Sequence, residues 1–244
     1  MRPLHVLRYK QDPSHCSIAS CASIANYYNK DITYKVAKEV CKANVLEDIP
    51  SGLYSSQIGL LLNHLGFRKV TIVSCDLSHY DFTWVNLSKH KKIDAISKMI
   101  RSKSVDEVIR DCLKSVREYL KAEDNSDNNL IIDYKFGDYI RQYLDVKKPL
   151  VLSFNWTMFF RQPKWDSKKP NYVTGNEEYH AVACRGYNDK GVHIVDSHHE
   201  FYKRKLKKFR DGYYLIPWEE LLTVMGTGDV IIPEEYDKDW ASKI

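Results

Sequence analysis

Helical and strand-like segments are distributed unevenly along the 244-residue chain, and this distribution most constrains its fold. The first half consists mainly of segments whose apolar residues recur at helical spacing, with one strand-like run, KVTIVSC, at residues 69–75. The second half contains several short apolar runs that are separated by turn residues, as strands are. Because the two kinds of segment are segregated rather than alternating, we predict an α+β domain rather than a series of βαβ units.

The first predicted helix, residues 16–28, is the most informative one. Its residues are small or apolar on nearly every side, which predicts a central, buried helix. Ser104, with Glu107 three residues later, matches a capping box and predicts that a separate helix begins there. The predicted helices cover residues 16–28, 34–42, 55–65, 93–122, 136–144 and 218–225.

Two of the late strands are predicted to form a hairpin. The predicted strands cover residues 150–156, 177–188, 191–198, 212–217 and 229–233. Asn188 and the residues up to Gly191 form a turn between the second and third of these strands. A hairpin centred on Asn188 places His180 roughly opposite Asp196, so that the two side chains lie within cross-strand reach.

Six cysteines are scattered along the chain, and none of them forms a C-x-x-C pair. Neither a zinc knuckle nor a disulfide framework is therefore indicated, and five of the six are interpreted as buried free thiols. Cys16 differs because it stands at the predicted N-terminus of the buried helix. Unpaired backbone amides and the helix dipole stabilise a thiolate there. The sequence leaves two alternatives for Cys16, a core thiol or a nucleophile.

The residues that a nucleophilic cysteine needs are present elsewhere in the chain. Gln11 precedes Cys16 by five residues and offers an amide donor to a negatively charged oxygen. His180 is a candidate base, and Asp196 is a candidate group to orient that base. Each residue alone is more often structural, but their order together with the late hairpin favours the catalytic interpretation.

With these residues, and most clearly in the stretch HAVACRGYNDKGVHIVDSH, the chain resembles the papain-like cysteine peptidases. It is most similar to the bacterial branch that contains the leader-peptide peptidases of bacteriocin transporters and the phytochelatin synthases. The resemblance covers about residues 9–75 and 130–232. It implies a papain-like core in which a helical lobe carries the nucleophile and an antiparallel sheet carries His and Asp. Residues 90–125 are then a helical insertion or cap within a single domain, residues 1–244.

The resemblance also implies a function. Cys16, His180 and Asp196 would form a catalytic triad that cleaves a peptide or isopeptide bond through a thioester, with Gln11 at the oxyanion and with no metal or cofactor. Acyl or peptidyl transfer by the same triad is an alternative. Ser17 stands where the family usually has glycine, Ser197 stands where it often has proline, and the Gln-to-Cys spacing is one residue shorter. Ser17 and the shifted Gln keep open a third alternative, a catalytically inactive module that binds a peptide or protein.

Other segments suggest binding roles. Trp156 and Tyr179 are candidate contacts to a peptide or protein substrate. The run DSHHE does not predict a metal site, because the adjacent His198 and His199 would point to opposite faces of a strand. The basic run 203–210 is either a solvated loop or a surface for an acidic partner. Its six basic residues are Lys203, Arg204, Lys205, Lys207, Lys208 and Arg210.

The overall charge and hydropathy favour a cytoplasmic enzyme. Thirty-seven basic and 32 acidic residues give a net charge of +5, which is too small to indicate nucleic acid as a partner. The chain has no apolar segment typical of a secretory signal and no run long enough to span a bilayer. We therefore predict a cytoplasmic location and no membrane partner.

Overall fold

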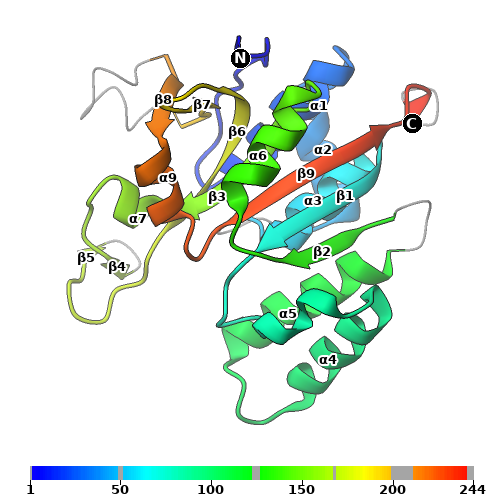
Figure 1. The fold of residues 1–244 in the computed structure, drawn as a ribbon, viewed down its shortest axis with the longest axis vertical. Coiled ribbons are helices and arrows are strands. Elements are labelled where there is room, and N and C mark those ends of the chain that lie inside the picture. Colours follow the sequence, from blue (N-terminus) through cyan, green and yellow to red (C-terminus); the bar gives the residue numbers. More distant parts are fainter. Residues whose placement is uncertain (1, 49–51, 123–126, 167–168, 199–210, 241–244) are drawn as a thin grey trace.

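A mostly antiparallel sheet organises the protein in the computed structural model, which describes residues 2–48, 52–122, 127–166, 169–198 and 211–240 (Figure 1). The strands of this sheet are β1 (Phe67–Ser74), β2 (Asn129–Ile132), β3 (Leu150–Asn155), β6 (Tyr179–Tyr187), β7 (Gly191–Val195), β8 (Tyr213–Pro217) and β9 (Asp229–Tyr236). Within the described residues, these seven strands lie in the order β2-β1-β9-β3-β6-β7-β8, and only β1 and β2 are parallel. This confirms the predicted α+β class.

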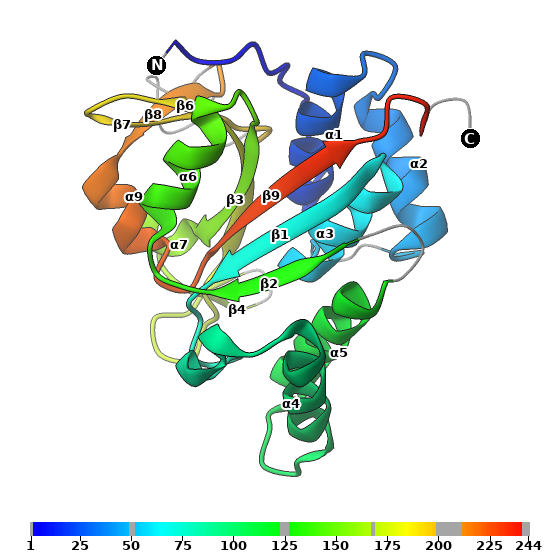
Figure 2. The same cartoon turned by 45° about the vertical axis from the view of Figure 1, so that its right-hand side comes forward.

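Helices cover both faces of the sheet (Figure 2). One face packs against α1 (Cys16–Tyr28), α2 (Tyr34–Asn44) and α3 (Ser55–His64), and the other packs against α6 (Phe136–Asp145) and α9 (Trp218–Val224). Along β3, Val151 belongs to the core under α1 to α3, whereas its neighbours Leu150 and Leu152 belong to the core under α6 and α9. The central strands are continuously apolar because both of their faces are buried.

Shorter elements connect the larger ones. A 3-10 helix, η1, covers Phe82–Asn86, and a single-turn helix, α7, covers Trp156–Phe159 directly after β3. Two two-residue strands, β4 (Trp165–Asp166) and β5 (Lys169–Pro170), pair with each other outside the main sheet.

Helix α1 is as central as its composition predicted. Ten consecutive residues, from Ser17 to Asn26, are buried. The hydroxyl of Ser20 donates a hydrogen bond to the carbonyl oxygen of Ala181 on β6 over 3.0 Å. Small side chains on α1 allow this close approach to the sheet, and the approach brings the first residue of α1, Cys16, to the start of β6.

The β6–β7 hairpin differs in register from the predicted one. Ala183 pairs with Val195, and the register shifts between Cys184 and Gly186, where the ladder is irregular. Continuation of the ladder places position 182, not His180, opposite Asp196. The prediction that His180 lies opposite Asp196 is therefore wrong by two residues, because Tyr187 pairs with Val192, which centres the turn between residues 189 and 190 rather than on Asn188. The bulge reduces the difference by one residue. His180 remains a diagonal neighbour of Asp196, which is still within side-chain reach.

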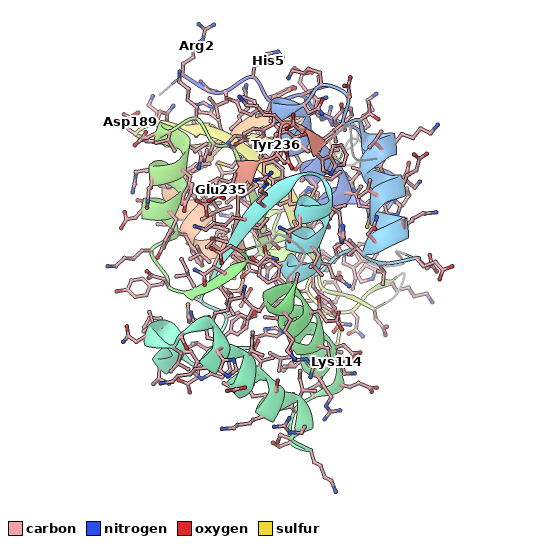
Figure 3. All side chains as sticks on the ribbon, turned by 90° about the vertical axis from the view of Figure 1, so that its right-hand side faces the viewer. Arg2, His5, Lys114, Asp189, Glu235 and Tyr236 are labelled. Atoms are coloured by element: carbon pink, nitrogen blue, oxygen red, sulfur yellow. The ribbon has the colours of Figure 1, made fainter. Side chains whose placement is uncertain are left out.

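Residues 89–121 form a helical hairpin below the sheet, where Lys114 marks the second helix in Figure 3. Its helices are α4 (Lys89–Arg101) and α5 (Glu107–Lys121). The N-cap of α5 is Asp106, whose carboxylate accepts a hydrogen bond from the amide of Val108 over 2.8 Å. The predicted start at Ser104 is therefore wrong, since an acidic N-cap two residues later satisfies the first turn of the helix.

The hairpin is joined to the core through α5. Tyr119 is fully buried, and its hydroxyl donates a hydrogen bond to the carbonyl oxygen of Val70 on β1 over 2.6 Å. The hydroxyls of Ser115 and Ser56 are hydrogen-bonded over 2.7 Å, which ties α5 to α3. From α4, the ammonium group of Lys92 donates to the carbonyl oxygen of Leu130 over 2.7 Å. Helix α5 is thus part of the hydrophobic core, while its status as an insertion relative to other family members stays a prediction.

Replacement of Tyr119 by alanine should show directly how much α5 contributes to the stability of the core. We expect the free energy of unfolding to fall by about 3–5 kcal/mol, because the change removes a buried ring and leaves a cavity. Tyr134, which is 63% exposed, is the matched control, and its replacement by alanine should change the value by less than about 0.5 kcal/mol. Urea denaturation of the two variants measures both values, and similar effects at the two positions would show that α5 contributes little to the core.

Candidate active site

Cys16 is the first residue of α1, and the chain before it is held in place. The N-cap residue, His15, makes no side-chain cap hydrogen bond, so capping does not use the amides of the first turn. The amide of Asp12 donates to the hydroxyl of Tyr34 over 3.1 Å, and the carboxylate of Asp12 lies 2.6 Å from the ammonium group of Lys38. These contacts with α2 fix the N-terminus of α1, and with it the position of the thiol.

His180 and Asp196 form a buried pair beside this thiol. The His180 Nε2 atom lies 2.8 Å from Asp196 Oδ1. Asp196 is fully buried, and His180 is only 5% exposed. Asp196 Oδ1 also accepts a hydrogen bond from the amide of His198 over 2.8 Å, and Oδ2 accepts one from the hydroxyl of Tyr214 over 2.7 Å. A buried carboxylate needs such donors, and here they also fix its orientation.

The imidazole links the carboxylate to the thiol. His180 is hydrogen-bonded to Cys16 as well as to Asp196. Because Nε2 is engaged with Asp196, Nδ1 is the ring nitrogen left for the thiol. Asp196 and Cys16 therefore lie on opposite sides of the imidazole ring, and the amide of Ala181 is also hydrogen-bonded to the Cys16 sulfur.

The electrostatic environment favours a charged thiol–imidazole pair. Burial opposes ionisation of Cys16, but the charge and hydrogen bond of His180, followed by the Ala181 amide and the Ser17 hydroxyl, lower the pKa of the thiol. Burial also opposes the charge on His180, but the Asp196 carboxylate and the Cys16 thiolate raise the pKa of the imidazole to about 10. Near neutral pH, a thiolate beside an imidazolium is the state that this arrangement stabilises.

Gln11 is attached to the strand end that carries Asp196. Its amide N–H donates to the carbonyl oxygen of Ser197 over 3.2 Å. The hydroxyl of Ser197, a buried residue, donates to Gln11 Oε1 over 2.7 Å. With its oxygen held in this way, the Gln11 side chain keeps its Nε2 group for donation to another acceptor.

Trp156 and Tyr179, the two predicted substrate contacts, lie next to His180 in different environments. Trp156 is 6% exposed, and its ring centroid lies 4.3 Å from that of His180 in an edge-on arrangement. It therefore covers the imidazole and excludes water from the bond to Asp196. Tyr179 is 46% exposed, and its hydroxyl is 2.7 Å from that of Thr227. A role of either residue in substrate binding stays a prediction.

Comparison with known protein families agrees with this geometry. The model of the Peptidase_C39 like family matches residues 3–223. The chain belongs to this family. This family is the bacteriocin-processing peptidase branch of the papain-like cysteine peptidases, so the resemblance found in the sequence is confirmed. As a C39-like protein, it is assigned to the cysteine peptidases, which act on peptide substrates. No curated protein and no solved structure matches the chain.

The C39-like chain places further residues at the site that sequence reasoning missed. Tyr214 pairs with Ile194 across β7 and β8, and the alternation in YYLIP could have predicted that it faces the Asp196 side. Arg8 donates from Nε to the carbonyl oxygen of Asp196 over 2.5 Å. The carbonyl oxygen of Gly212 accepts a hydrogen bond from the Asp196 amide over 2.8 Å. Gly212 has a φ of +68°, and a Cβ at this position would clash with the Arg8 side chain. No sequence pattern indicated Arg8 or Gly212, because they act through backbone geometry.

Several predictions concern features outside this site. The basic run 203–210 and His199 lie outside the described residues of the C39-like chain. Among the residues that the structure does describe, no group of three or more histidines, cysteines or carboxylates is placed to hold a metal ion. Over the same ranges, none of the helices combines the length and apolar character that crossing a membrane requires.

Proposed function

We propose that this C39-like protein is a cysteine peptidase that hydrolyses a peptide or isopeptide bond through a thioester on Cys16. The observation that carries the proposal is the position of His180, which is hydrogen-bonded to the Cys16 thiol and to the Asp196 carboxylate at once. Cys16 is then the nucleophile, His180 is the general base and acid, and Asp196 fixes the imidazole tautomer.

The proposed reaction has two steps. The Cys16 thiolate attacks the carbonyl carbon of the substrate, and the backbone amide of Cys16 together with Gln11 Nε2 donates to the resulting oxyanion. His180 gives its proton to the leaving amine, and a thioester remains. In the second step, His180 takes a proton from water, the hydroxide adds to the thioester, and the Cys16 thiolate leaves. Tyr179, which is exposed directly before His180, is assigned to the substrate side of the site.

Two departures from the family pattern support catalysis rather than its loss. Ser17, which replaces the usual glycine, has its hydroxyl 3.9 Å from the Cys16 sulfur and helps to lower the pKa of the thiol. Ser197, which replaces the usual proline, holds the Gln11 amide by its oxygen. These two contacts argue against the alternative of an inactive binding module, for which Ser17 and the shorter Gln-to-Cys spacing were the motive.

Acylation with p-nitrophenyl acetate tests the proposal without knowledge of the natural substrate. We expect the Cys16 peptide to gain an acetyl group and then to lose it again by hydrolysis, and Cys16→Ala should show neither event. Peptide mapping by mass spectrometry follows both stages. A Cys16 that is not acylated, or an acetyl group that is not released, would contradict the proposed hydrolysis. Release as acetyl-glycylglycine when that dipeptide is added would instead identify a transferase.

Ser197→Ala should separate oxyanion stabilisation from thiol activation. Without the Ser197 hydroxyl the Gln11 amide loses its fixed orientation, and we expect acylation by p-nitrophenyl acetate to slow by about tenfold. Alkylation of Cys16 by iodoacetamide should stay unchanged, because that reaction forms no oxyanion. Ser115→Ala is the matched control. It also removes a buried serine hydroxyl, but the hydrogen bond of that hydroxyl joins α5 to Ser56 on α3, away from Gln11. An equal loss of acylation and alkylation in Ser197→Ala would show that Ser197 acts on folding alone.

A further inference from the structure

The two carboxylate oxygens of Asp196 face different donors. Oδ1 lies 2.8 Å from His180 Nε2 and accepts a hydrogen bond from the amide of His198 over 2.8 Å. Oδ2 accepts a hydrogen bond from the hydroxyl of Tyr214 over 2.7 Å. The proposed reaction gives Tyr214 no role, although its hydroxyl contacts the carboxylate that orients the proposed base.

Strand β8 brings Tyr214 to this carboxylate. Among the described residues, β8 is the last strand of the sheet and lies beside β7 (Figure 1). Tyr214 pairs with Ile194, and the ladder continues to Asp196, whose amide donates to the carbonyl oxygen of Gly212. Side chains two residues apart leave a strand on the same face, so Ile194 and Asp196 both face the side of Tyr214. The tyrosine hydroxyl reaches the carboxylate as a diagonal neighbour across the two strands.

Packing fixes the ring of Tyr214. The residue is 8% exposed and belongs to the core under α6 and α9. Its ring is stacked on that of Phe159 in α7, with the centroids 6.4 Å apart and the planes inclined by 17°. The Phe159 ring in turn meets Phe154 of β3 edge-on, with the centroids 5.4 Å apart. Because the ring is enclosed in this way, its hydroxyl is held at one position, facing the carboxylate.

A donor at Oδ2 affects the carboxylate in two ways. Asp196 is fully buried, so an oxygen that lost its donor would find no water to replace it. The Tyr214 hydroxyl therefore stabilises the charged form of the carboxylate. It also opposes rotation of the carboxylate about the Cβ–Cγ bond, which would turn Oδ1 away from His180. Both effects act on the group that holds the imidazolium.

We infer that Tyr214 is a positioning residue for the chemistry at Cys16. Its hydroxyl keeps the Asp196 carboxylate charged and turned toward His180, and it acts through Asp196 rather than on the substrate. This role rests on the proposed function, in which Asp196 orients the imidazole. Strand β8 thereby contributes to the active site together with β6 and β7.

Tyr214→Phe tests this role, because it removes the hydroxyl and keeps a ring that packs on Phe159. We expect acylation of Cys16 by p-nitrophenyl acetate to slow by about tenfold, since one hydrogen bond to a charged group is lost. Tyr139→Phe is the matched control, because the Tyr139 hydroxyl also donates to a carboxylate, Asp133 Oδ2, over 3.1 Å, but this carboxylate is outside the triad. Its acylation rate should equal that of the unmodified protein. Equal rates in the two variants would overturn the inference, whereas an unmodified protein that is not acylated at all would contradict the proposed function.

Proton NMR provides a second readout that does not depend on activity. The proton between His180 Nε2 and Asp196 Oδ1 joins two side chains that are 5% and 0% exposed, so it should exchange slowly and give a strongly deshielded signal. His180→Gln identifies this signal by its loss. Tyr214→Phe should move the signal, because the carboxylate that accepts the proton loses a donor, and Tyr139→Phe should leave it in place. An unmoved signal in Tyr214→Phe, together with a lower thermal midpoint, would show that Tyr214 contributes to stability alone and would overturn the inference.

Discussion

His180→Gln is expected to slow alkylation of Cys16 by iodoacetamide at about pH 6.5 by roughly two orders of magnitude. Glutamine keeps an amide donor that can face Asp196, so the buried carboxylate stays paired. It cannot carry a proton, so the thiolate loses the positive charge that stabilises it. Burial then acts on the thiol with only the Ala181 amide and the Ser17 hydroxyl opposing it, and it favours the neutral, unreactive form. The rate is measured at the Cys16 peptide after timed alkylation.

The pH dependence of the unmodified protein should show the same pair. The pKa of the Cys16 thiol is lowered, so its reactivity should appear at lower pH than that of an ordinary cysteine. His180 must be protonated to supply the proton that an amine leaving group needs, so acylation by a peptide substrate should fall again as the pH rises through its pKa of about 10. The two limbs describe the coupled pair rather than either residue alone. In His180→Gln, the rise of Cys16 reactivity should move to higher pH, and the fall of acylation near the pKa of His180 should disappear.

His193→Gln is the control for this substitution. His193 lies on β7, and burial followed by the charge of Arg185 lowers the pKa of its imidazole. Its replacement removes a half-buried histidine from the same hairpin without touching the thiol. A Cys16 rate that falls equally in both variants would show that the hairpin, not the imidazole of His180, controls the thiol.

The sequence predicted which residues come together at the candidate site better than it predicted the paths between elements. Cys16, His180 and Asp196 could be recognised because a thiol at the start of a buried helix and a His–Asp pair on neighbouring strands each leave a local pattern. The hairpin register could not, because the turn is centred between residues 189 and 190 rather than on Asn188, and the register shift between Cys184 and Gly186 leaves no local pattern in the sequence.

Elements that rest on distant contacts were also missed. Strand β2 has four residues, NLII, and is too short for its periodicity to be distinguished from the polar loop before it. It is a strand because it pairs in parallel with β1, from Thr71 to Ser74.

Asp196→Asn is expected to have the largest effect on catalysis that preserves the shape of the site. Acylation of Cys16 by p-nitrophenyl acetate should fall by about 10³–10⁴-fold, because an amide cannot hold the imidazolium or fix the tautomer of His180. The substitution also reduces the acceptors for three donors, the Tyr214 hydroxyl, the His198 amide and the His180 ring. Some loss of thermal stability should therefore accompany the loss of activity.

Asp229→Asn distinguishes these two effects. Asp229 is a half-buried residue on β9; burial raises the pKa of its carboxyl, and hydrogen bonds with Ser55 and Ser74 only partly oppose that shift. An amide should replace this carboxyl at little cost, and acylation at Cys16 should remain near that of the unmodified protein. If Asp196→Asn loses no more activity than Asp229→Asn, then Asp196 holds the strand end in place and His180 alone activates the thiol. A loss confined to Asp196→Asn instead means that the carboxylate acts through the imidazole, because both substitutions replace one carboxyl oxygen with an amide nitrogen.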